Sequence, residues 1–265
     1  MNNADAQNMP LNADNLLNPQ FNNNEHLRLI DLENKIINAD CMDILRRLPD
    51  KCVDLVLTDP PYGGGNMMLG KAKNVLGSVG CLINTTSINR TGGTWSKKYQ
   101  QGGVFSKDIR HWDIAPTQEV FDEIFRVSKN QIIWGGNYFN LPPTRCFNVW
   151  KKLTISEKFS MSMAEYAWVS YNGNAKIWEY APQDSARFHP TQKPVPLFMR
   201  QIEEYTNEGD LILDCFSGSG TTAIACHRLN RRFICIEKDK EYWEASVKRL
   251  EDERKQLSLF GSVAE

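Results

Sequence analysis

The chain has 265 residues, of which 41% are hydrophobic and 24% charged, and its formal net charge at pH 7 is -1. These values are typical of an enzyme with one large core, and they exclude a protein that is basic over its whole surface. No apolar run is long enough to cross a bilayer, and the N-terminus has no signal-peptide pattern, so we expect a cytoplasmic protein. The cysteines lack CxxC spacing, which predicts buried free thiols and neither disulfides nor a metal site.

Apolar runs alternate with helical patterns through most of the chain. We expect an asparagine-rich tail over residues 1–25, one folded domain over 26–258 and a frayed tail over 259–265. Short apolar runs predict strands at 35–38, 53–58, 131–134, 147–150, 166–171, 211–214 and 232–236. Helical periodicity predicts helices after residue 40, over 116–128, over 194–206, from the turn at 215–222 to residue 228, and at the C-terminus. This alternation predicts an α/β protein with a mostly parallel sheet.

The run VDLVLTDPPY, residues 53–62, joins a buried strand to a rigid polar end. A buried parallel strand opens into a ligand site at its carboxyl end. Pro60 and Pro61 fix the backbone and carry no N–H, so the carbonyl of Pro60 is free to accept a hydrogen bond. Asp59 adds an acceptor and Tyr62 adds a flat aromatic face, which together suit a planar group that carries an NH2. The alternative is a turn that only ends the strand, with Tyr62 packed on the rim.

A second ligand-binding pattern lies near the C-terminus. A strand ending on Asp214 leads into a turn with Gly218 and Gly220, followed by a helix and a strand that ends on Glu237. Glycines let a ligand approach the backbone, and the acid suits a ribose diol. The glycine spacing also fits the dinucleotide fingerprint, which leaves an NAD-dependent oxidoreductase as an alternative. A dinucleotide fold needs further strands after the acid, whereas one predicted helix follows Glu237, so the chain order argues against it.

Basic and aromatic side chains gather in the long segment 63–108. A loop of this length inside a domain is usually functional or disordered. Lysines mixed with aromatic residues suit phosphate contacts and base stacking, so we expect this insertion to contact DNA, with a solvated loop as the alternative. The candidate nucleic-acid-binding residues are Lys97, Lys98, Lys107, Arg110, Lys151, Lys152 and Arg187.

Three motifs occur in a fixed order: Asp59-Pro60-Pro61-Tyr62, then HPTQKP at residues 189–194, then Asp214-x-Phe216-x-Gly218-x-Gly220. With this order the chain resembles the amino-methyltransferases that act on exocyclic nitrogens of nucleic-acid bases, in particular the beta-type DNA adenine-N6 methyltransferases. The resemblance implies a Rossmann-like S-adenosylmethionine-dependent fold with permuted motif order. Its sheet would have seven strands, mostly parallel with one antiparallel, and helices on both faces. Residues 35–171 would form the catalytic half and 189–256 the cofactor half.

The resemblance also implies roles for individual residues. The catalytic residues would be Asp59, Pro60, Pro61 and Tyr62. Glu237 would bind the ribose of S-adenosyl-L-methionine, and Asp40, which is also expected to cap the helix after the first strand, would bind its adenine end. The full set expected at the cofactor is Asp40, Cys41, Asp59, His189, Lys193, Asp214, Phe216, Ser217, Gly218, Gly220, Thr221 and Glu237.

The implied substrate is double-stranded DNA, methylated by direct transfer on the N6 amine of a flipped adenine, with no metal. A cognate restriction endonuclease and a homodimer are partners that the resemblance leaves open. Aspartate at the first position of the tetrapeptide resembles the adenine type. Cytosine-N4 enzymes, where serine is more usual, and RNA adenine methyltransferases are the nearest alternatives. A catalytically dead nucleic-acid-binding protein on the same fold is an alternative of another class.

Overall fold

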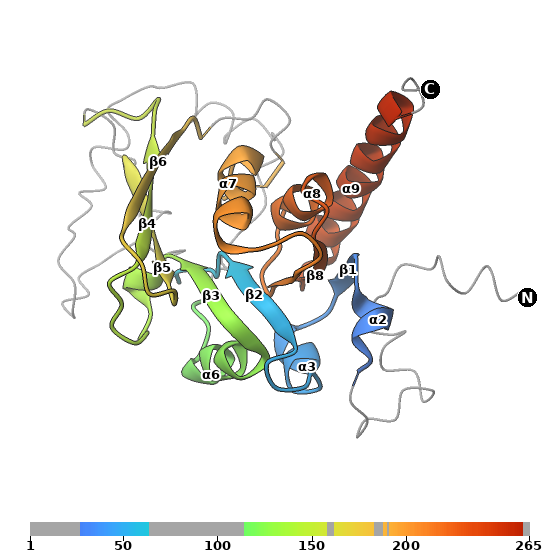
Figure 1. The fold of residues 1–265 in the computed structure, drawn as a ribbon, viewed down its shortest axis with the longest axis horizontal. Helices are drawn as coiled ribbons and strands as arrows, with labels where there is room; N and C mark the ends of the chain where they lie inside the picture. Colours follow the sequence, from blue (N-terminus) through green and yellow to red (C-terminus); the bar gives the residue numbers. More distant parts are fainter. Residues whose placement is uncertain (1–26, 64–113, 158–161, 183–187, 190, 262–265) are drawn as a thin grey trace, which may run out of the picture.

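The computed structural model describes residues 27–63, 114–157, 162–182, 188–189 and 191–261, and of residues 257–261 the backbone alone. The described strands join in one sheet (Figure 1) in the order β1-β8-β7-β2-β3-β5-β4-β6. In chain order they are β1 (Lys35–Asn38), β2 (Val53–Thr58), β3 (Ser128–Trp134), β4 (Phe147–Lys152), β5 (Ala164–Val169), β6 (Lys176–Tyr180), β7 (Leu211–Asp214) and β8 (Arg232–Glu237). The helices are α2 (Leu29–Leu32), α3 (Cys41–Leu45), α6 (Gln118–Val127), the 3-10 turn η2 (Gly136–Tyr138), α7 (Val195–Tyr205), α8 (Thr221–Arg228) and α9 (Lys240–Gly261).

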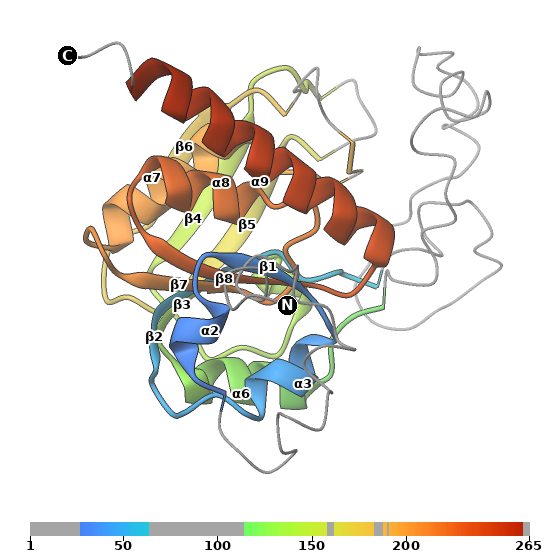
Figure 2. The same cartoon turned by 90° about the vertical axis from the view of Figure 1, so that its right-hand side faces the viewer.

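Helices cover both faces of the sheet, with α3 and α6 on one face and α7, α8 and α9 on the other (Figures 1 and 2). Each layer has its own core. Ile44 and Ile124 belong to the cluster on the side of α3 and α6, whereas Phe198, Ile224 and Trp243 belong to the cluster on the other side. Since the central strands are covered on both faces, they have the continuous apolar runs that predict a parallel sheet.

The helix α6 shows how the sequence defines these layers. Val120, Ile124 and Val127 recur at helical spacing and are all buried, so one face of the helix packs on the sheet. The helix ends at Ser128, whose extended backbone begins β3. The predicted helix and strand at this place are therefore confirmed, with bounds that differ by a few residues.

The predicted mixture of strand directions is confirmed, but the predicted number of strands is wrong. β5 runs antiparallel to both of its neighbours, β3 and β4, and the remaining pairs in the described sheet are parallel. Within the described residues the sheet has eight strands and not seven, because β6 pairs with β4 at the edge. Ile177 and Glu179 of β6 are exposed, so no buried apolar run marks this strand in the sequence.

Other expectations concern the ends of elements and the cysteines. We expected a frayed tail from residue 259, but α9 continues to Gly261. The six described cysteines are free, as predicted. Across the described segments, no helix is both long and apolar enough to span a membrane. The same segments hold no group of three metal-binding side chains.

Candidate active site

Four strand ends meet at the carboxyl edge of the sheet. β1 pairs with β8, β8 with β7 and β7 with β2, all in parallel, so their carboxyl ends lie side by side. Asp40 lies just beyond β1 and Asp59 directly after β2, while Asp214 ends β7 and Glu237 ends β8. This edge therefore brings together the Asp59–Tyr62 segment and the glycine-rich turn, which are far apart in the sequence.

Asp59 is half-buried at the end of β2 and accepts two hydrogen bonds from side chains. Lys193 Nζ donates to Oδ2 at 2.5 Å, and the hydroxyl of Tyr62 donates to Oδ1 at 2.7 Å. Burial raises the pKa of Asp59 above its ordinary value, while the ammonium of Lys193 opposes this shift. The two donors fix the plane of the carboxylate and leave each oxygen with room for a further hydrogen bond.

Tyr62 is held close to the backbone that follows β3. Its ring stacks on Tyr138 with centroids 4.8 Å apart and contacts Phe139 edge-on at 6.2 Å. Gly135 has a φ of +67°, and a Cβ on it would lie 2.1 Å from Cε1 of Tyr62. Only glycine fits both the backbone conformation and the ring, so Gly135 sets where Tyr62 stands.

Lys193 belongs to a chain of four buried or half-buried charges. Its Nζ also lies 3.0 Å from Oε2 of Glu165, and Lys152 Nζ lies 2.5 Å from Oε1 of the same carboxylate. Burial opposes the charge on Glu165, but Lys193 and Lys152 outweigh it and lower its pKa to about 2. Burial likewise opposes the charge on Lys193, yet Asp59 and Glu165 raise its pKa. The formal charges of the four groups sum to zero.

The glycine-rich turn closes on the acid at the end of β8. Gly218 and Gly220 have φ of +50° and +72°, which favours glycine at both positions. The N–H of Gly218 donates to Oε2 of Glu237 at 2.7 Å, and the N–H of Asp239 donates to Oε1 at 2.8 Å. Burial raises the pKa of Glu237 to about 7. Each carboxylate oxygen keeps a lone pair that a hydroxyl group could use.

Asp214 braces the start of this turn. Its carboxylate accepts hydrogen bonds from the hydroxyls of Thr58 at 2.8 Å and Thr222 at 2.5 Å, and from the N–H of Phe216 at 3.1 Å. Burial raises its pKa to about 6, against these three donors. Asp214 accepts these three hydrogen bonds from its own chain and so supports the turn. A direct contact between Asp214 and the cofactor stays a prediction.

Three further residues expected at the cofactor, Asp40, Cys41 and His189, differ in their contacts and burial. Asp40 caps α3 by accepting from the N–H of Met42 at 3.0 Å, as predicted, and it also pairs with Lys238 at 2.8 Å. Cys41 is buried, and burial raises the pKa of its thiol to about 12. His189 is buried against Gly218, where a Cβ would lie 3.3 Å from Nε2.

Two of the predicted nucleic-acid-binding residues are described, and one of them does not suit the role. Lys151 is exposed and pairs with Glu179 at 2.6 Å, so it is accessible. Lys152 is 8% exposed and is committed to Glu165, because β4 turns alternate side chains to opposite faces. We therefore correct the expectation for Lys152. Outside the described residues lie Lys97, Lys98, Lys107, Arg110, Arg187 and the greater part of the expected insertion 63–108.

The structure adds residues that the sequence analysis missed. Glu165 lies inside β5, at the position paired with Trp150. An acidic residue within a strand was the one feature of the sequence that could have indicated its role. Gly135 and Gly136 form an adjacent pair after a buried strand, and such a pair indicates that another group approaches the backbone closely. Nothing in the sequence indicates that Tyr138 reaches Tyr62.

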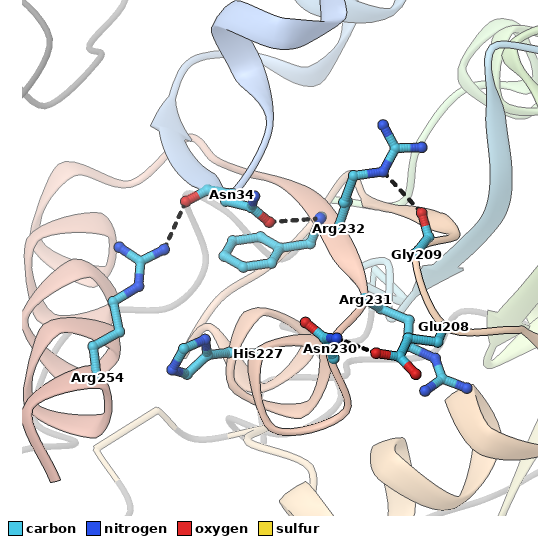
Figure 3. A pocket seen from close by; sticks show the side chains of 9 residues that line it. Asn34, Glu208, Gly209, His227, Asn230, Arg231, Arg232 and Arg254 are labelled. Atoms are coloured by element: carbon cyan, nitrogen blue, oxygen red, sulfur yellow. Dashed lines mark hydrogen bonds between the residues drawn. The ribbon is translucent and has the colours of Figure 1, made fainter. Parts of the chain in front are cut away.

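A separate pocket of about 480 Å³ lies at the opposite edge of the sheet (Figure 3). It is lined by residues that precede or begin strands, among them Asn34, Gly209 and Arg232. Arg232 donates to the carbonyl of Gly209 at 2.8 Å and Arg254 to that of Asn34 at 2.9 Å. Both arginines thus donate hydrogen bonds to backbone carbonyls. The pocket is remote from the strand ends that carry Asp59.

The fold and these strand ends define a Rossmann-like methyltransferase, with the glycine-rich turn after β7 and the polar tetrapeptide after β2. A model of the DNA methylase family, which covers N6 and N4 enzymes, matches residues 116–248, half of the chain. The chain belongs to this N6/N4 DNA methylase family. Membership confirms the expected amino-methyltransferase class and its cofactor, S-adenosyl-L-methionine.

Curated relatives agree with this membership. The type II methyltransferase M2.MboI of Moraxella bovis is 27% identical over 254 residues, which cover 81% of this chain and 86% of the relative. M2.DpnII of Streptococcus pneumoniae is 26% identical over 274 residues, which cover 89% and 93%. Among solved structures, the DNA modification methylase TTHA0409 of Thermus thermophilus has a TM-score of 0.48 at 19% identity, with 82% of this chain and 94% of that chain covered.

Proposed function

We propose that this DNA methyltransferase transfers a methyl group to the N6 amine of adenine in double-stranded DNA. The observation that carries the proposal is the setting of Asp59. Its carboxyl group is oriented by Lys193 and Tyr62 at the sheet edge that also holds the glycine-rich turn. Asp59 and the carbonyl of Pro60 give a planar amine two acceptors, one for each N–H.

The residues of the turn fit the cofactor. Gly218 packs against His189, and Gly220 against Ser246 and Ile36, so the turn is tight, and Ser217 Oγ is buried without a partner among the described residues. Glu237 would hold the ribose hydroxyls, and Phe216 the adenine ring from one side. When bound, S-adenosylmethionine supplies an electrophilic methyl group on its sulfonium.

The chain's own residues would act on the amine. The lone pair of the adenine amine is delocalised into the ring, so the nitrogen is a poor nucleophile. Hydrogen bonds from its two N–H groups to Asp59 and to the carbonyl of Pro60 favour a pyramidal nitrogen with its lone pair exposed. The surplus proton would leave afterwards through Asp59 to water.

The amine is hidden inside a duplex, so the base has to leave the stack at a cost of a few kcal/mol. Tyr62, whose hydroxyl donates to Asp59, would support the flipped base. One face of Tyr62 is covered by Tyr138, which is 63% exposed and stands on the short turn η2. The flipped base would therefore stack on a part of the Tyr62 ring that Tyr138 does not cover, or it would displace Tyr138.

The choice of adenine rests on Asp59. The aspartate resembles the adenine type, whereas cytosine-N4 enzymes more often carry serine there. The relatives M2.MboI and M2.DpnII are named type II methyltransferases, which supports a cognate restriction endonuclease as the partner. A homodimer is a further partner that the resemblance leaves open.

The test is transfer of labelled methyl from S-adenosylmethionine to mixed-sequence duplex DNA, followed by mass spectrometry of the nucleosides. We expect N6-methyladenine in the product and none with Asp59→Ala. N4-methylcytosine would overturn the choice of base. Label in RNA alone would overturn the choice of substrate, and bound cofactor without any transfer would favour the catalytically dead alternative.

A further inference from the structure

Four charged side chains from four parts of the fold meet beside the Asp59–Tyr62 segment. Asp59 follows β2, Lys152 ends β4, Glu165 lies on β5 and Lys193 precedes α7. The contacts run in a line: Asp59 to Lys193 at 2.5 Å, Lys193 to Glu165 at 3.0 Å, and Glu165 to Lys152 at 2.5 Å. Both lysines are less than a tenth exposed, so water screens these charges weakly.

Lys193 is shared between two carboxylates. Its ammonium has three hydrogens, and its contacts include both Asp59 and Glu165. The ammonium also lies 5.5 Å from the ring of the buried Trp134, so its position is enclosed. The strength of its bond to Asp59 therefore depends on how strongly Glu165 attracts it from the other side.

We propose that Glu165 and Lys152 are positioning residues, which set how firmly Lys193 holds Asp59 and hence how available Asp59 is to the target amine. The kinetic part of this inference rests on the proposed function. The electrostatic part concerns the free protein and stands without it.

The groups that face Asp59 come from each neighbouring element. Tyr62 donates to it from the same turn and Lys193 from the segment before α7. The charges of Glu165 on β5 and Asp214 on β7 act through space. Neither Glu165 nor Lys152, which pairs with Glu165, contacts Asp59 directly, so their substitution tests the network and leaves the reacting groups in place.

Opposite substitutions give opposite expectations. Glu165→Gln removes the carboxylate that competes for Lys193, so the ammonium binds Asp59 alone and the carboxylate is harder to protonate. Lys152→Met removes a positive charge and leaves Glu165 with Lys193 as its remaining partner in the network, so Lys193 is drawn away from Asp59. The midpoint of Asp59 protonation should fall by about one pH unit in the first variant and rise by about one in the second. In the double variant Lys152 has no carboxylate through which to act, so the midpoint should stay near that of Glu165→Gln.

Two measurements on the full chain test the inference. The first is the ¹³C chemical shift of the Asp59 carboxyl in the free protein against pH, assigned by its absence in Asp59→Asn. The second is the pH dependence of kcat for DNA methylation, whose acid limb should move with the same sign. Both single variants should lose about tenfold in kcat at pH 7, while KM for S-adenosylmethionine stays within about twofold. Lys152→Arg keeps the charge and serves as the matched control.

The outcomes separate the two claims. Midpoints that stay at the wild-type value, or that move in the same direction in both single variants, would overturn the inference. A titration that shifts as expected in a protein that methylates no DNA would support the network and refute the proposed function. If one single variant does not fold, the sign of the shift in the other decides.

Discussion

Asp59 has to combine two properties that oppose each other. As an acceptor for a neutral amine it must be ionised, and as a buried group it is penalised for its charge. Lys193 opposes the cost of burying this charge, because its ammonium lies 2.5 Å from Oδ2, where it stabilises the anion and also fixes its direction. Tyr62 adds a neutral donor, which orients the second oxygen and brings no further charge.

The fit between Gly135 and Tyr62 gives the first prediction. Gly135→Ala should displace the ring of Tyr62, since the new Cβ would lie 2.1 Å from Cε1 at a backbone φ of +67°. We expect a loss of at least about 100-fold in kcat, together with destabilisation of about 1–3 kcal/mol. Gly209→Ala is the matched control, because Gly209 has a φ of +81° with no atom within 4 Å. The control should lose similar stability and keep its activity, as measured by urea unfolding and methyl transfer.

The second prediction separates the amine site from the cofactor site. Asp59→Ala should abolish turnover and largely keep the affinity for S-adenosylmethionine. Gly218→Asp should weaken that affinity at least about tenfold, because its side chain would stand beside His189 at a φ of +50° and a second carboxylate would lie next to Glu237. Isothermal titration of both variants checks this. Unchanged affinity in Gly218→Asp would count against the proposed pocket.

At the scale of elements, the site is a product of strand direction. Parallel pairing of β1, β8, β7 and β2 brings their carboxyl ends to one edge, where each strand delivers one acid or turn. The antiparallel strand β5 and its neighbour β4 supply Glu165 and Lys152 to Lys193. The strands on one side of β2 thus build the proposed cofactor pocket, and those on the other side support Asp59.

A third prediction concerns the link between α6 and the segment before β2. Arg126 donates to the carbonyls of Leu45 and Leu48 and pairs with Asp50 and Glu123, all within 2.8 Å. Arg126→Met should cost about 2–3 kcal/mol, because two half-buried carbonyls lose their donor along with the ion pairs.

The matched control for this link is Arg46→Met. Arg46 on the C-terminal side of α3 pairs with Glu119 on α6 at 2.6 Å, but both side chains are more than half exposed. Water screens such a pair, so we expect a much smaller loss of stability than in Arg126→Met. Urea unfolding of the two variants measures the difference. Equal losses would show that burial does not decide the strength of these contacts.

At the scale of the whole molecule, the sequence contained the order of the elements and most of the acids at the carboxyl edge. The tetrapeptide and the glycine-rich turn are local patterns, so they could be located without the fold. The Lys193–Glu165 contact joins segments that are separate in sequence, and a lysine in a motif does not reveal its partner. β6 was missed for a related reason, since an edge strand with exposed Ile177 has no apolar run.

The last prediction is the pH dependence of stability contributed by Asp214. Burial raises its pKa in the folded chain from 3.8 to about 6. Below pH 4 both states are protonated, and its contribution to stability is fully present. Between pH 4 and 6 the unfolded chain ionises while the folded chain keeps the proton, so the free energy of unfolding falls as pH rises. The fall is on the order of 3 kcal/mol and is complete above pH 6.

Asp214→Asn isolates this contribution, because the amide cannot ionise and keeps an oxygen for the N–H of Phe216. Glu237, whose pKa is also raised by burial, to about 7, is present in both proteins, so most of its contribution cancels in the difference. We expect the stability of Asp214→Asn relative to wild type to increase from pH 4 to pH 6 and then level off, as followed by urea unfolding. A difference that does not change with pH would mean that Asp214 is ionised in the folded state throughout, with Thr58 and Thr222 fully offsetting the cost of its burial.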